Sequence, residues 1–341
     1  QLPVTCVALS SDDRTIYSGS KDNAVVRWDL EAGEASKTVL RPKWARKTHP
    51  DTQASMGEVL AMAVTTDGKY LACGGRDCLV RIFDTRINQE IKAFQGHRDA
   101  VTAMAFRRDS NSLFTGSLDR CVKHWDLNEM GYLETAFGHQ DGIYGMDCWN
   151  KARPASASAD KTVRHWKIAE DAHLVFRGHK SSVDTVQILT TDSILSSGAD
   201  GSLCLWKETQ KKPVVTVRAA HGFESDQLVG AAQSGIPRWL SSLTCVKMSN
   251  LAASGSSDGT VKLWHASAED HELYEVGNLP CGGFVNGLAM SSRVLVAGTG
   301  TEHRLGRWWR LKGPLNKVVV YKLPDLGDEI SAHRAAAESD D

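Results

Sequence analysis

A six-residue spacing between an aspartate and an aromatic residue recurs along this chain and constrains its fold more than any other feature. The aspartate follows a run of small residues such as SGS or TGS, and an apolar stretch leads from it to the aromatic ring. Apolar and polar residues alternate around these anchors in short runs, as in half-buried strands. Recurrence about every 40 residues indicates that one small β unit is repeated. The six pairs are Asp22/Trp28, Asp77/Phe83, Asp119/Trp125, Asp160/Trp166, Asp200/Trp206 and Asp258/Trp264.

The spacing between repeats predicts two insertions. Successive aromatic residues lie 42, 41 and 40 residues apart from Phe83 to Trp206, but the interval stretches to 55 and 58 residues on either side of that region. The extra residues fall at about 41–58 and 222–239. Each insertion precedes the first strand of a repeat, so we expect both on the same face, where loops on a rigid scaffold often bind partners.

These repeats resemble the WD-repeat family over residues 1 to about 323. The resemblance implies an all-β fold, a seven-bladed WD-repeat β-propeller with four-stranded antiparallel blades. The seventh repeat is degenerate, with Glu302 six residues before Trp308. Its spacing predicts that the stretch LGRWWR is the third strand of blade seven and that NKVVVYKL is the outer strand.

Recurring histidine, serine and aspartate residues invite comparison with a catalytic triad. We reject that assignment, because an active site is built once and this set is repeated at fixed spacing in several blades. The family resemblance instead implies a buried relay of hydrogen bonds from Trp to Ser or Thr, then to His and Asp. In blade two, Cys73 and Phe83 cannot supply these bonds. The relay residues implied are His97, Thr115, Asp119 and Trp125; His139, Ser156, Asp160 and Trp166; and His179, Ser196, Asp200 and Trp206.

Other signals of catalysis or of membrane insertion are weak. The stretches GGRD and GTGTEH are glycine-bearing turns between strands rather than phosphate loops before a helix. No His, Cys and carboxylate cluster has metal-ligand spacing, and the eight cysteines include no C-x-x-C pair, as expected of reduced thiols in an intracellular protein. No apolar run of about 18 residues could span a membrane. We predict a protein without catalytic residues, metal or cofactor.

The charge distribution singles out blade seven. Net charge is −1, but the last 18 residues carry six acids and one arginine, and we expect this acidic tail, 324–341, to be disordered. Residues 292–323 hold seven Lys and Arg against one acid. Such a basic sector suits an anionic ligand, although ion pairs within the blades, or a solvated loop in the first insertion, would also satisfy these charges. The candidate RNA-binding residues are His303, Arg304, Arg307 and Arg310, with Arg41, Lys43, Arg46 and Lys47 as a second set.

Several stretches resemble a narrower family, the WD-repeat subunits of the U3 small nucleolar ribonucleoprotein. They are EHRLGRWWR with NKVVVYKL, LPVTCVALSSDDRTIYSGSKD, GHRDAVTAMAFRR and FGHQDGIYGMD. This resemblance implies a nucleolar protein that binds the box B/C region of U3 small nucleolar RNA with a kink-turn-binding protein. It also implies other small-subunit processome proteins as partners and a role in pre-18S rRNA processing. A propeller that docks peptides, as ubiquitin-ligase adaptors and histone readers do, is the alternative, because propellers host many functions. Trp308 or Trp309 is expected to be the aromatic anchor of blade seven.

Overall fold

The computed structural model describes residues 2–31, 37–40, 57–149, 151–224, 235–306, 310–311, 313 and 316–323. Within them the chain forms 27 strands and a short 3₁₀ helix, Ile168–Glu170. The first four sheets contain β1 (Val4–Leu9), β2 (Thr15–Ser20), β3 (Val25–Asp29), β4 (Lys37–Leu40); β5 (Val59–Val64), β6 (Tyr70–Gly75), β7 (Val80–Asp84), β8 (Gln89–Phe94); β9 (Val101–Phe106), β10 (Ser112–Ser117), β11 (Val122–Asp126), β12 (Gly131–Ala136); and β13 (Ile143–Asp147), β14 (Ala155–Ser158), β15 (Thr162–Lys167), β16 (Ala172–Arg177). The last three contain β17 (Val183–Ile188), β18 (Ser193–Gly198), β19 (Leu203–Lys207), β20 (Val215–Val217); β21 (Leu240–Cys245), β22 (Leu251–Ser256), β23 (Thr260–Ser267), β24 (Glu272–Pro280); and β25 (Phe284–Met290), β26 (Val294–Gly300), β27 (Lys317–Lys322).

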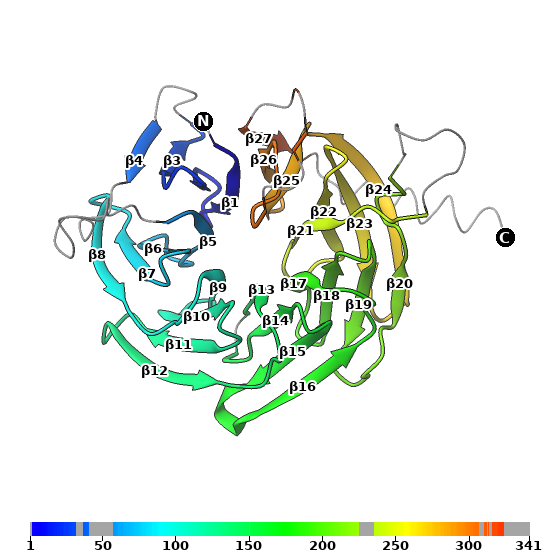
Figure 1. The fold of residues 1–341 in the computed structure, drawn as a ribbon, viewed down its shortest axis with the longest axis horizontal. Coiled ribbons are helices and arrows are strands. Elements are labelled where there is room, and N and C mark those ends of the chain that lie inside the picture. The colour runs from blue at the N-terminus through cyan, green and yellow to red at the C-terminus, as the bar shows by residue number, and fades with distance from the viewer. Residues whose placement is uncertain are drawn as a thin grey trace.

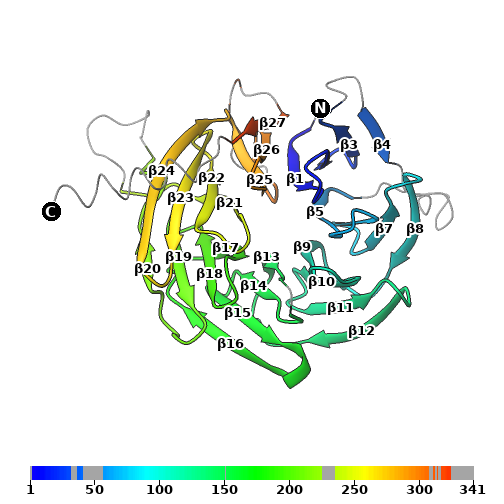
Figure 2. The ribbon, with the colours of Figure 1, turned by 180° about the vertical axis from the view of Figure 1, so that it is seen from behind.

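The seven antiparallel sheets stand in a ring as the blades of a propeller (Figures 1 and 2). The first strand of each blade packs against the first strand of the next, and β25 closes the ring against β1. The predicted fold class is therefore confirmed. Six blades have four strands, and blade seven has three strands within the described part of the chain.

Apolar residues fill the spaces between neighbouring blades. One cluster joins Val80 and Ile82 of blade two to Val101 and Trp125 of blade three. Glycine in the second strand allows this close approach, since a Cβ on Gly74 would lie 2.7 Å from the side chain of Val101. The core is thus divided among the blade interfaces, as radial repetition requires.

The relay residues meet in blades three, four and five. In blade three, Trp125 Nε1 donates to Thr115 Oγ1 at 2.9 Å, and His97 lies 2.8 Å from both Thr115 and Asp119. The same contacts join His139 to Ser156 (2.7 Å) and Asp160 (2.8 Å), and Trp166 to Ser156 (2.8 Å). They also join His179 to Ser196 (2.7 Å) and Asp200 (3.3 Å), and Trp206 to Ser196 (2.7 Å).

Blade six contains a relay that the sequence reading missed. His221 lies 2.8 Å from both Asp258 and Ser254, and Trp264 donates to Ser254 at 2.8 Å. The second insertion separates this histidine from its aspartate by 37 residues. In blades three to five the separation is 21 or 22 residues, so that spacing does not predict His221. In blade two the aspartate Asp77 is bound by Arg81 instead.

The strand order predicted for blade seven is wrong. β27 pairs directly with β26 from Val294↔Lys322 to Thr299↔Lys317, so NKVVVYKL occupies the third place in the sheet. After Gly300 the chain leaves the blade and turns at Arg304 and Leu305. The six-residue spacing from Glu302 to Trp308 therefore matches the repeat by sequence alone, because Glu302 lies in a segment that has left the sheet.

Candidate nucleic-acid interface

Residues 302–306, here called the channel-mouth loop, lie at the face where the inner strands begin. Register sets this position, because Phe284 at the start of β25 pairs with Gly300 at the end of β26. By the same register, both insertions return to that face, as the starts of β5 and β21 pair with the ends of β6 and β22. Of the predicted RNA-binding residues, the structure describes His303, Arg304 and Arg310. Arg307, Arg41, Lys43, Arg46, Lys47, Trp308, Trp309 and the acidic tail 324–341 lie outside the described residues.

Arg304 points into the central channel rather than toward solvent. Its side chain borders a cavity lined by the inner strands of all seven blades. Nη2 donates to the carbonyl oxygen of Tyr144 at 2.6 Å and Nη1 to that of Thr102 at 3.5 Å. The residue is 8% exposed. Burial lowers the pKa of the guanidinium, and the nearby Asp184 carboxyl opposes that shift.

This position corrects the expectation that Arg304 contacts phosphate directly. The guanidinium is 8% exposed and its Nη atoms already donate to backbone carbonyls, and it remains charged because its ordinary pKa exceeds 12. Carbonyl oxygens from two blades take the place of the carboxylate or phosphate that the sequence led us to expect. The side chain anchors the channel-mouth loop to the channel wall.

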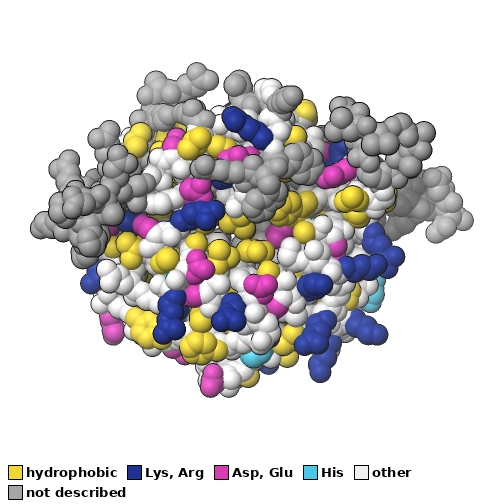
Figure 3. Space-filling view, viewed as in Figure 1, with side chains coloured by type: hydrophobic (Ala, Val, Ile, Leu, Met, Phe, Trp, Pro, Cys, Tyr) yellow, Lys and Arg dark blue, Asp and Glu magenta, His cyan; other side chains and the backbone are white. Residues whose placement is uncertain are grey.

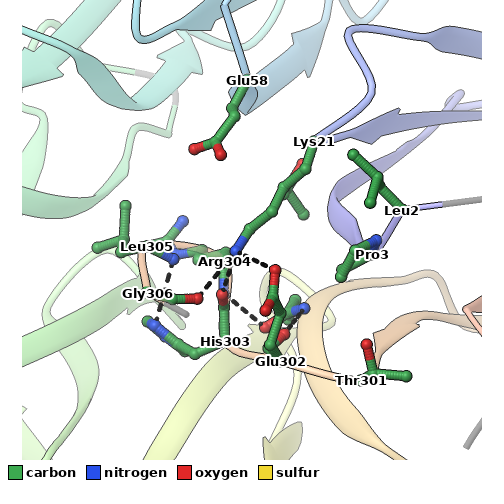
Figure 4. Close-up of polar contacts among 12 residues, drawn as sticks. Leu2, Pro3, Lys21, Glu58, Thr301, Glu302, His303, Arg304, Leu305 and Gly306 are labelled. Atoms are coloured by element: carbon green, nitrogen blue, oxygen red, sulfur yellow. Dashed lines mark hydrogen bonds and ion pairs between the residues drawn. The ribbon is translucent and has the colours of Figure 1, made fainter. Parts of the chain in front are cut away.

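Lys21 binds the same loop across the closure of the ring (Figure 4), and Asn286 adds further hydrogen bonds. Lys21 Nζ donates to Glu302 Oε1 at 3.0 Å and to the carbonyl oxygens of His303 and Gly306 at 2.8 and 2.9 Å. Asn286 Nδ2 donates to the carbonyl oxygens of Val4 and Glu302, at 2.9 and 3.0 Å. Blade one, blade seven and the loop are thus joined by charge-assisted and amide hydrogen bonds.

His303 is held as a neutral ring. Its centroid lies 4.0 Å from that of Trp239, and Nδ1 accepts a hydrogen bond from the Leu305 amide at 3.3 Å. Burial lowers the pKa of His303 well below its ordinary value, and the charges of Arg304 and Lys21 lower it further. At neutral pH this ring carries no positive charge for phosphate, so its contribution is packing.

The end of the second insertion contacts the channel-mouth loop, and the end of the first is linked to it through Arg76. At the first, Arg76 pairs with Glu58 at 2.5 Å and donates to the carbonyl oxygen of Leu305 at 3.4 Å. At the second, Trp239 packs against His303 with the two rings tilted by 36°, and its Nε1 donates to the Asp184 carboxyl group. Arg310 is exposed and forms an isolated bridge with Glu302. Within the described residues, the ends of the two insertions at Glu58 and Trp239 are therefore linked to the channel-mouth loop.

Asp184 makes this region sensitive to pH. Burial raises the pKa of its carboxyl to about 7, against the hydrogen bond from Trp239 and the charge of Arg304, which lower it. The pKa of the Asp184 carboxyl is about 4 in the unfolded chain and higher in the folded protein. Its contribution to stability is therefore fully present below about pH 4 and is lost as the pH rises through the folded-state pKa.

Replacement of Asp184 should therefore remove a pH-dependent part of stability. Relative to Asp184→Asn, the wild type is expected to lose about 2–3 kcal/mol of unfolding free energy between about pH 5 and 7.5. Thermal unfolding followed by circular dichroism at the two pH values measures this. Asp171→Asn at an exposed position is the control, and equal pH dependence in wild type and Asp184→Asn would contradict the assignment.

The described residues hold no other chemistry-bearing centre of note. Among them, no group of three His, Cys, Asp or Glu side chains could hold a metal ion. The cysteines are free. No helix in the described part of the chain is long and apolar enough to cross a membrane.

Comparison with known proteins gives consistent matches along the chain. The WD40 family (WD domain, G-beta repeat) matches residues 1–29, 47–84, 88–126, 172–207 and 236–265. U3 small nucleolar RNA-interacting protein 2 of Homo sapiens is 39% identical over 326 residues, 95% of this chain and 67% of that protein. The U3 snoRNP-associated protein-like EMB2271 of Arabidopsis thaliana is 36% identical over 332 residues, 95% of this chain and 69% of that protein. A solved structure of U3-55K has a TM-score of 0.86 at 38% identity, over 95% of this chain and 96% of that one.

Proposed function

Because this chain belongs to the WD-repeat family of U3 small nucleolar ribonucleoprotein-associated proteins, we propose that it is a non-catalytic, RNA- and protein-binding subunit of that particle. It binds the box B/C region of U3 small nucleolar RNA together with a kink-turn-binding protein. Its partners include other small-subunit processome proteins, and it acts in the nucleolus in pre-18S rRNA processing and small ribosomal subunit biogenesis.

One observation carries the placement of the RNA site. The channel-mouth loop is fixed by Arg304, Lys21 and Asn286. It also contacts Arg76, the partner of Glu58, and Trp239 at the end of the second insertion. A loop that is ordered before binding loses little conformational entropy when the ligand arrives. Structured RNA is recognised through its shape, its backbone and its unstacked bases, which suits such a fixed surface.

The cations divide into two roles in this proposal. Arg304 and His303 position the loop from within, because both side chains are buried. The proposed phosphate contacts come from residues that follow the channel-mouth loop in sequence and from the first insertion. They are Arg307, Arg310, Arg41, Lys43, Arg46 and Lys47. Arginine and lysine contacts to phosphate fix register on the RNA.

A gel-shift titration on box B/C RNA, with and without the kink-turn-binding protein, tests the function. We expect binding to the preformed RNA–protein complex, and we expect that binding to weaken steeply with salt. A peptide-docking propeller would show no salt-sensitive binding to this RNA. Absence of a shift even with the partner present would overturn the proposal.

A further inference from the structure

A second basic surface lies away from the channel mouth, on the rim of blades four and five. Figure 3 shows Lys and Arg side chains gathered at the lower right, over β16, β19 and β20. The Arg177 amide at the end of β16 donates to the Lys211 carbonyl at 3.5 Å, so the two blades adjoin here. The Lys180 amide donates to Asp200 of blade five at 2.7 Å. We call this surface the basic rim, and its exposed cations are Lys161, Arg177, Lys180, Lys211, Lys212 and Arg218.

These charges have no partners among the residues that the structure describes. None of the six side chains belongs to an ion pair there. The nearby carboxylates of Asp160 and Asp200 are already engaged by His139 and His179 in the relays. These exposed cations can therefore contact an external anion without first breaking an ion pair.

A buried arginine in β15, next to β16, adds to the positive charge of the basic rim. Arg164 is 8% exposed, and burial lowers the pKa of its guanidinium; the Asp160 carboxylate opposes that shift, and the charge of Arg177 adds to it. Its Nη1 lies 2.6 Å from His173 Nε2, while its Nε has no hydrogen-bond partner within the described chain. The Asp160 carboxylate that acts on Arg164 is already bound by His139, so a ligand of opposite charge over this surface would gain from the charges of both Arg164 and Arg177.

An exposed aromatic ring lies at the edge of the rim. Phe137 is 71% exposed and follows the outer strand β12 of blade three. The next residue, Gly138, is so close to the Arg164 guanidinium that a Cβ there would lie 2.3 Å from Nη1. A free ring beside a cationic track is the combination that proteins use for single-stranded nucleic acid, with bases stacked on the ring and phosphates on the cations.

We propose that the basic rim binds a single-stranded segment of RNA, with phosphates on Arg177, Lys211 and their neighbours and a base stacked on Phe137. This goes beyond the proposed function, which concerns the U3 RNA at the channel mouth. An acidic protein segment would use the cations but would leave the solvent-exposed Phe137 ring without a role. The combination of both features favours RNA.

Fluorescence anisotropy with a labelled, unstructured oligonucleotide of about twelve nucleotides tests the proposal. Arg177→Glu with Lys211→Glu and Lys212→Glu should weaken binding at least tenfold at about 0.1 M salt and reduce the salt slope by about 2. Phe137→Ala should weaken it about fivefold or more. The control, Lys92→Glu with Lys151→Glu and Arg293→Glu, makes the same charge change at exposed positions elsewhere and should bind like the wild type.

Three outcomes would overturn the proposal. They are no oligonucleotide binding by the folded wild type at low salt, equal affinity of the wild type and the rim variant, or an unchanged affinity of Phe137→Ala combined with full competition by polyglutamate. The last would identify an acidic-protein surface. The rim variant should still bind box B/C RNA with its partner, so failure here is separable from failure of the proposed function.

Discussion

Lys21→Met is expected to lower the free energy of unfolding by about 3 kcal/mol, because it removes one partner of a buried ion pair. The Lys21 side chain is 1% exposed and that of Glu302 is 12% exposed. Without Lys21, the Glu302 carboxylate and two loop carbonyls lose their donor at the contact between blades one and seven. Thermal and denaturant unfolding measure the loss.

Two further variants isolate the cause. Lys21→Met combined with Glu302→Gln should recover part of the stability, since no unpaired carboxylate then remains in the seam. Lys262→Met breaks a more exposed pair with Glu275 and should cost less than about 1 kcal/mol. If Lys21→Met has the same free energy of unfolding as the wild type, this contact does not hold the ring closed.

Replacement of Arg304 should separate anchoring from direct contact with RNA. Both Arg304→Ala and Arg304→Lys are expected to weaken binding to the RNA–protein complex by about tenfold or more, because a 1.4 kcal/mol loss in loop preorganisation has that effect. Lysine keeps the charge but lacks the planar fork that reaches both Tyr144 and Thr102.

Amide hydrogen exchange measures how well the loop is held in place, which loss of the Arg304 charge alone would not change. Residues 302–306 should exchange faster in both Arg304 variants, and Arg86→Ala, at an arginine whose side chain is 66% exposed, should leave them unchanged. Wild-type binding by Arg304→Lys, with the loop still protected, would show that charge alone suffices and that the carbonyl contacts do not position the loop.

The sequence was sufficient for the fold because each blade repeats its own anchors. Six aspartate–aromatic pairs predicted six of the blades, and the intervals between them predicted two insertions. Local spacing failed where the chain departs from the period. His221 is separated from Asp258 by an insertion, and Glu302 keeps a repeat spacing in a segment that leaves the sheet.

The interior of the channel could not be predicted from local patterns. Its wall is built by seven strands spread over the whole chain, so nothing near Arg304 in sequence reveals the Tyr144 and Thr102 carbonyls that receive it. The same holds for Lys21, which lies 281 residues from Glu302. Charge density drew attention to this segment, but only the ring geometry distinguishes buried anchors such as Arg304 from exposed cations such as Arg310.

The most direct test of the RNA site is a gel-shift titration of Arg307→Glu combined with Arg310→Glu on box B/C RNA with the kink-turn-binding protein. The proposed interface predicts that this variant, with a wild-type circular dichroism spectrum, binds the complex at least tenfold more weakly than the wild type, as expected for the loss of about two phosphate contacts. Equal binding by the folded variant would contradict a phosphate-contacting role for these arginines and would move the RNA site elsewhere, first to Arg41, Lys43, Arg46 and Lys47.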